Sequence, residues 1–169
     1  MSGGGAGPEA DLVRESAEAA AAKLRFCRIA FGTGGEQAVN LSEMGRVAAD
    51  MRRGTRATCR WTADGTATRA EARLAFLLTL CVEGALPGGG TVTIGRDGSA
   101  WRVAGTGPAP RCEPAMWAML GGGAVPSDLD AARVHFALAR AAADALGVVV
   151  GVEFADDGVA TAFAVDRAD

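Results

Sequence analysis

The chain has 169 residues and a formal net charge of -3, from 17 basic and 20 acidic side chains. This length suits one domain with its own core, and we expect a compact domain with a helical appendage. The absence of a long basic run argues against nucleic-acid binding, and no apolar run approaches the roughly 18 to 20 residues of a membrane span. The beginning of the chain is unlike a signal peptide, so we expect a soluble, cytoplasmic protein.

The first segment, residues 1–10, is rich in glycine and polar residues and is expected to be a disordered leader. A helix follows over 11–31, because this stretch is rich in alanine and other helix formers and is stopped by Gly32. We expect this helix and the turn that follows it, residues 11–33, to form a dimerisation or bundle segment. At about 100° per residue, one stripe of this helix is apolar and the opposite face is charged. The apolar stripe comprises Leu12, Ala19, Phe26 and Ala30, and the charged face comprises Arg14, Glu18, Arg25 and Arg28.

An apolar stripe on a helix needs a helical partner. No second helix of that length adjoins it in the sequence. The expected partner is therefore a second copy of the chain, which makes a homodimer, or a helix that precedes this one.

Residues 36–166 are expected to form the compact domain. A short helix begins near Ser42 as its N-cap and ends at Gly54, a strand follows over 57–61, and a longer helix covers 68–86. Two strands then alternate about an Asp97–Gly98 turn, which is a strong hairpin signal. A short helix over 114–120 and a long helix over 127–147, capped by Ser127 or Asp128, precede a second hairpin with its turn at Asp157–Gly158. This order predicts an α+β fold, a two-layer sandwich of helices on one sheet.

The residue types give few candidates for chemistry. The four cysteines, Cys27, Cys59, Cys81 and Cys112, are irregularly spaced, so we expect free thiols in a reducing compartment and no metal site. The single histidine, His135, lies in the long helix among Val134, Phe136 and Leu138, which indicates a position at the edge of the core. No cofactor is expected.

The order of elements resembles the ATP-binding domain of sensor histidine kinases, of the gyrase and Hsp90 type. In that family a helix with an N-x-x-x-N motif leads to a P-x-G-G turn; here Thr79 and Glu83 replace both asparagines. A D-x-G-x-G motif then reads adenine, and here Val103 replaces the aspartate. The family's phosphate-binding glycine loop is also missing: the long helix opens with Asp128 and Asp130, which would repel a triphosphate. The resemblance therefore implies the fold without ATP binding.

A helix ending in "KLRFCRIAFG" before such a domain, with the passage "ALPGGGTVTI" and the hairpin "DDGVATA", is similar to ChpT-type histidine phosphotransferases. Membership would imply a dimer with a four-helix bundle, in which a histidine in an H-D motif relays phosphoryl groups between the aspartates of receiver domains. The chain departs from this family because the helix with the H-D motif is missing from it, and His135 stands elsewhere.

Our main hypothesis is a histidine phosphotransferase, or its C-terminal portion, in a bacterial two-component phosphorelay. Its partners would be response-regulator receiver domains. Their acidic phosphorylation site could be met by the basic helix face of Arg14, Arg25 and Arg28, although such a face can also be merely solvated. Two alternatives remain: a non-catalytic adaptor that pairs with an intact relative, and an ATP-dependent kinase in which Glu83 would hold magnesium.

Overall fold

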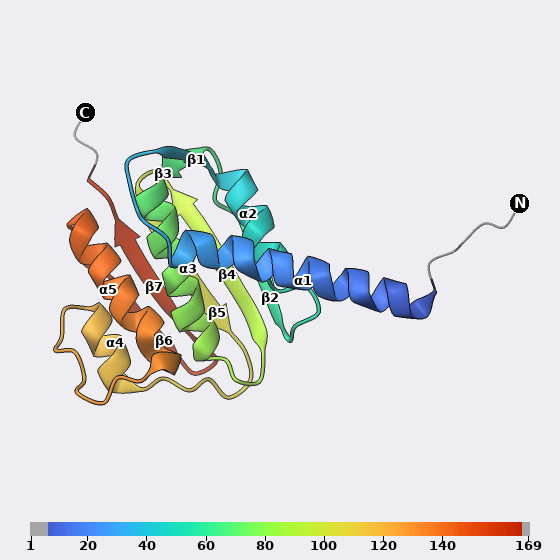
Figure 1. Cartoon of the computed structure of the whole chain (residues 1–169). Helices are drawn as coiled ribbons and strands as arrows, with labels where there is room; N and C mark the ends of the chain where they lie inside the picture. Colours follow the sequence, from blue (N-terminus) through green and yellow to red (C-terminus); the bar gives the residue numbers. More distant parts are fainter. Residues whose placement is uncertain (1–6, 167–169) are drawn as a thin grey trace, which may run out of the picture.

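The computed structural model describes residues 7–166 and shows the expected two-layer sandwich with a long helix beside it (Figure 1). The expected leader lies outside the described residues over 1–6. Its last three residues, Pro8–Ala10, instead form the first turn of α1 (Pro8–Ala30). Proline suits this first helical position because its fixed φ is helical and its missing N–H would have no partner there.

One face of a five-stranded mixed sheet carries the helices. Its strand order is β2-β4-β5-β7-β6. Only the pairing of β2 with β4 is parallel; the other neighbours are antiparallel. The strands are β2 (Ala57–Trp61), β4 (Gly90–Asp97), β5 (Ala100–Thr106), β6 (Gly151–Ala155) and β7 (Gly158–Ala164).

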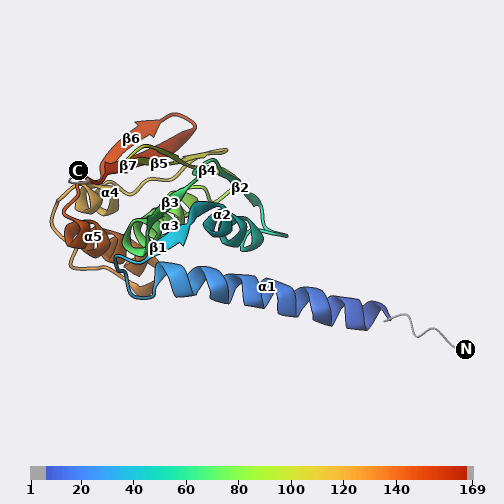
Figure 2. The same ribbon diagram turned by 90° about the horizontal axis from the view of Figure 1, so that it is seen from above.

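The helical layer is centred on α3 (Arg69–Gly84), which contacts the sheet, α1 and α5. Beside it lie α2 (Leu41–Asp50), α5 (Val134–Leu146) and the short α4 (Pro114–Leu120), as Figure 2 shows from above. The core between the layers contains the buried side chains of Phe76, Leu77, Ile94 and Trp101. The first hairpin and the helix α4 are confirmed, but the hairpin pairs Asp97 with Ala100, so its turn residues are Gly98–Ser99, one position later than expected.

Three further local expectations were wrong. The N-cap of α2 is Asn40, whose side chain accepts a hydrogen bond from the Glu43 N–H, and not Ser42. The long helix begins at Val134, because Asp130 caps a 3-10 turn (Ala131–Arg133) in front of it. The last hairpin pairs Ala155 with Gly158, so its turn residues are one position earlier than expected.

A small second sheet was not expected from the sequence. Strands β1 (Ala38–Asn40) and β3 (Thr66–Thr68) pair antiparallel beside α2 and α3. Each has only three residues, which is too short for an alternating pattern to show. Thr68 also caps α3 in a reciprocal capping box with Glu71, so this small sheet fixes where α3 begins.

Candidate functional site

Helix α1 projects from the domain, and most of its N-terminal half is exposed (Figure 2). Only its C-terminal part is buried, at Ala22, Phe26 and Ala30. The ring of Phe26 lies 4.7 Å from that of Phe76 in α3. The expectation that the stripe lacks a partner in its own chain was therefore wrong for its C-terminal half, because α2 and α3 cover it.

The connection between α1 and the domain is fixed by hydrogen bonds from the first turns of α3. The Arg69 Nε donates to the Thr33 carbonyl at 3.1 Å, and the Arg73 Nε donates to the Ala30 carbonyl at 3.3 Å. Two backbone N–H groups, of Arg69 and Ala70, donate to the carbonyls of Gln37 and Gly35. These contacts, together with the buried Phe26, hold α1 in one orientation.

A second apolar stripe of α1 faces solvent. Val13, Leu24 and Phe31 are 68%, 65% and 46% exposed, and at about 100° per residue they share one face of the helix. Large apolar side chains aligned on one exposed face mark a surface for another helix or protein. The sequence pattern did not separate this stripe from the one that is buried within the chain.

The three arginines expected to meet a receiver domain lie on one face of α1 but have different surroundings. Arg14 forms ion pairs with Asp11 and Glu18, and the hydrogen bonds that it donates to these carboxylates raise its pKa. Arg25 lies 3.8 Å from a carboxylate oxygen of Asp50 in α2.

Arg28 is exposed and forms no ion pair with any described residue. Beside this face, α1 and the end of α2 enclose an open groove of about 880 Å³. The uncompensated positive charge of α1 therefore lies at its C-terminal end, next to the domain.

A buried ion pair occupies the place that the kinase resemblance assigns to the metal-binding asparagine. The Arg52 Nη2 donates to Glu83 Oε2 at 2.7 Å, and its Nη1 donates to the Ala48 carbonyl at 2.7 Å. The guanidinium also stacks over the ring of Phe26, 5.3 Å from its centre. Only 2% of the Arg52 side chain is exposed, against 26% for Glu83. The sequence gives no local sign of this pair, because the partners are 31 residues apart.

The other positions of the altered ATP-binding motifs also have structural roles. Thr79 is buried and its hydroxyl donates to the Ala75 carbonyl at 2.7 Å. Val103 is fully buried in the core. Asp130 accepts a hydrogen bond from the Arg133 N–H as a cap, and Asp128 is exposed in the segment before it.

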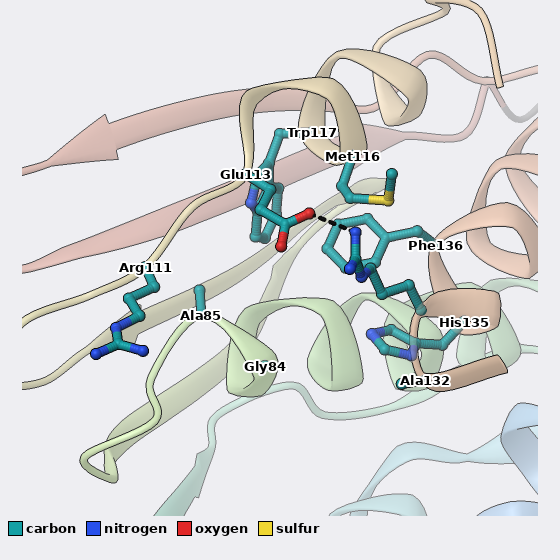
Figure 3. A pocket seen from close by; sticks show the side chains of 10 residues that line it. Gly84, Ala85, Arg111, Glu113, Met116, Trp117, Ala132, His135 and Phe136 are labelled. Atoms are coloured by element: carbon teal, nitrogen blue, oxygen red, sulfur yellow. Dashed lines mark hydrogen bonds and ion pairs between the residues drawn. The ribbon is translucent and has the colours of Figure 1, made fainter. Parts of the chain in front are cut away.

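His135 lies in the first turn of α5, where its ring faces Gly84 at the end of α3 (Figure 3). The ring is half-buried, which agrees with the expected position at the edge of the core. Burial lowers the pKa of His135 below its usual range, so the imidazole is neutral at neutral pH. Its Nε2 atom is buried and forms no hydrogen bond with any described residue.

The described residues contain neither a metal-binding cluster nor a helix that could span a membrane. Across 7–166, no group of three or more His, Cys, Asp or Glu side chains is placed to hold a metal ion. No helix in the same range combines the length and apolar character of a membrane span.

Solved structures define the class of fold. The chain is similar to the mycobacterial sensor histidine kinase MprB (15% identity, TM-score 0.54, covering 78% of this chain and 97% of that one). It also resembles the catalytic domain of the histidine kinase ThkA in a nucleotide-free form (15% identity, TM-score 0.52, covering 78% and 95%). The fold is therefore that of the ATPase-like domain of histidine kinases.

Two further comparisons define the family. The structure matches a bacterial phosphotransferase with a TM-score of 0.79 and 25% identity, covering 95% of this chain and 80% of that one. Residues 41–158 match the model of the histidine phosphotransferase C-terminal domain. The chain belongs to this family, as its motifs indicated. No match was found among curated proteins.

Proposed function

We propose that this protein acts in a two-component phosphorelay as a histidine phosphotransferase that neither binds nor uses ATP. A histidine nitrogen attacks the phosphorus of a receiver's aspartyl phosphate. The bond from phosphorus to the carboxylate oxygen breaks, a P–N bond forms, and the imidazole proton leaves. A second receiver's aspartate then takes the phosphoryl group by the reverse step. Histidine suits this relay because its neutral imidazole is a good nucleophile near pH 7. Membership of the family supports the relay.

The Arg52–Glu83 pair is the observation that supports independence from ATP. Glu83 Oε2 accepts a hydrogen bond from Arg52 at 2.7 Å, so a magnesium ion on the same carboxylate would lie beside a guanidinium that has almost no access to water. The two positive charges would repel each other where water screens them little. The pair thus argues against the kinase alternative, which depends on Glu83 as the metal ligand.

The acceptor histidine is not identified with His135 in this proposal. The His135 ring is half-buried against the domain, and its Nε2 faces a pocket. We propose instead that the acceptor lies outside the sequence printed here, whose only histidine is His135, on another helix of a bundle packed along the exposed stripe of α1. The same stripe supports a homodimer, since Val13 and Leu24 leave a large apolar face uncovered.

Receiver domains are proposed to dock along the arginine face of α1. Arg28 has no ion pair among the described residues and Arg25 has a long one, so these two provide the attraction toward an acidic partner. Arg14 contributes less because Asp11 and Glu18 already compensate its charge. Complementary charge of this kind raises association rates and selects partners.

Binding to a receiver domain activated with beryllofluoride tests the docking proposal. We expect Arg28→Glu to weaken binding about tenfold and Arg14→Glu to weaken it much less. Arg60→Glu provides a matched control, because Arg60 is an exposed arginine on β2, away from α1. Equal losses in all three variants would mean that only net charge matters and would contradict this docking site.

The adaptor function remains a second candidate because the only histidine of the sequence is half-buried. An adaptor would bind an intact phosphotransferase through α1 and would carry no phosphoryl group itself. Mixing the native protein, purified from its source cells, with a radiolabelled, phosphorylated receiver separates the two functions: phosphohistidine at a residue other than His135 supports the transferase, and its absence supports the adaptor. We place either function in the cytoplasm, where the free thiols of all four cysteines would remain reduced.

A further inference from the structure

A pocket of about 210 Å³ lies between the end of α3, the segment before α4, and the start of α5 (Figure 3). Gly84 and Ala85 form its floor, and Met116, Trp117 and Phe136 provide an apolar wall. The Arg111 N–H donates to the Ala85 carbonyl at 2.8 Å, which fastens the segment before α4 to the end of α3. The pocket is therefore part of the folded domain and is separate from the arginine face of α1.

The two arginines at the pocket, Arg111 and Arg133, face two carboxylates, and only Arg111 has no ion pair among the described residues. The Arg133 Nη1 donates to Glu113 Oε2 at 2.6 Å, and Arg133 is also paired with Asp130 at 3.5 Å. Arg111, at the rim, is exposed and has no ion pair among the described residues. Glu113 is held by Arg133, so it is the charge of Arg111 that an incoming group would meet.

A polar contact is available on the opposite side of the pocket from the rim. The buried Nε2 of His135 is not hydrogen-bonded to any described residue, and such buried polar atoms are rare in folded proteins. This nitrogen lies next to Gly84, since a Cβ added to Gly84 would be 3.9 Å from it. A small pocket with an apolar wall and a few convergent polar groups is the usual form of a ligand site.

We propose that this pocket binds a small organic monoanion with a flat apolar body, such as an aromatic carboxylate. Arg111 binds the carboxylate, the edge-to-face pair of Trp117 and Phe136 packs on the ring, and His135 Nε2 is placed to hydrogen-bond a polar substituent of the ring where the ligand has one. Such a ligand would join the end of α3 to the segment before α4 and regulate the domain without taking part in phosphoryl transfer.

The size and charge of the pocket favour a small anion. Its volume of about 210 Å³ is below the ~300 Å³ at which pockets for drug-sized ligands begin. Arg111 is the one lining arginine without an ion pair among the described residues, and a single arginine suits a monoanion better than a di- or triphosphate. The pocket is thus expected to bind small monoanions and not nucleotides.

Proton and carbon NMR of the His135 imidazole provides the test, because the sequence has no other histidine and the signal needs no assignment. Benzoate is the probe, and benzamide is the neutral control of the same shape. We expect benzoate to shift the His135 signal saturably, with a Kd of about 1 mM, and benzamide to bind about tenfold more weakly. A linear or absent response to benzoate up to about 20 mM, well above that Kd, would overturn the proposal.

Two variants test the position of the ligand. Arg111→Ala should weaken benzoate binding about tenfold, and Gly84→Leu should abolish it by filling the pocket beside His135. Arg60→Ala, which removes the same charge on β2, should leave binding unchanged. Because Arg111 is exposed, its variant tests the site even if Gly84→Leu fails to fold. Unchanged benzoate binding in Arg111→Ala would refute the site.

Discussion

Replacing Arg52 with alanine tests the role assigned to the buried ion pair. The change removes hydrogen bonds to Glu83 and to the Ala48 carbonyl, both 2.7 Å long, and the guanidinium that stacks on Phe26. Breaking a buried pair costs ~3–5 kcal/mol when the remaining charge stays buried. Because Glu83 is 26% exposed and can turn toward water, we take the lower end and expect a loss of ~3 kcal/mol of unfolding free energy.

Urea unfolding followed by tryptophan fluorescence measures this loss, since Trp101 and Trp117 lie in the core. Arg53→Ala is the matched control: Arg53 is the next residue, and its side chain is 77% exposed and paired with Asp50. Such a surface pair contributes ~0.5 kcal/mol or less. Glu83→Gln keeps a hydrogen-bond acceptor but leaves the Arg52 guanidinium buried without its countercharge, so it should also lose ~3 kcal/mol. If Arg52→Ala and Arg53→Ala differ by less than about 1 kcal/mol, the pair is not the structural element described here.

Three more results follow from the structure. Leu24→Arg should convert a dimer to a monomer, as measured by light scattering. The control Val149→Arg, at a similarly exposed apolar residue outside α1, should leave the mass unchanged. A dimer that survives Leu24→Arg would contradict the helix interface. In an NMR titration, the pKa of His135 should lie below its usual value of about 6.5. The unfolded state then binds more protons than the folded state in this range, so the free energy of unfolding should fall as the pH drops from about 6.5 toward the folded-state pKa. A titration midpoint at or above about 6.5 would contradict the burial of His135. Gly158→Ala should cost ~3 kcal/mol in urea unfolding, because its Cβ would collide with the Gly105 carbonyl oxygen, a backbone atom that cannot turn away; a loss below ~1 kcal/mol would show that the two strands can separate.

Local signals in the sequence predicted most elements of the fold. The Asp97–Gly98 dipeptide indicated one hairpin to within one residue of its turn, and Pro114 marked the first residue of α4. Gly147, in the left-handed conformation with φ 67°, ends α5 as expected. These signals are reliable because each acts within a few residues.

Contacts between distant residues could not be predicted in the same way. Asn40 caps α2 and also ends β1, whose pairing with β3 has no local signature. The Phe26–Phe76 contact depends on where α1 ends relative to α3. Helical periodicity gave the apolar stripe of α1 but not the element that covers it.

Only part of the candidate site was predicted, because it too depends on contacts between distant residues. The altered motif positions Glu83 and Val103 were recognised from their order along the chain, but the guanidinium that holds Glu83 comes from the end of α2. Likewise, the position of His135 at the core edge followed from its neighbours, whereas the pocket beside it is formed by three separate segments.

Phosphorylation of the native protein, purified from its source cells, tests the central claim most directly. The protein is incubated either with a radiolabelled, phosphorylated receiver domain or with γ-labelled ATP, and the labelled residue is mapped by its acid-labile, alkali-stable bond. We predict phosphohistidine from the receiver, at a residue other than His135, and no label from ATP. Label acquired from ATP, or none from any receiver, would contradict an ATP-independent histidine phosphotransferase.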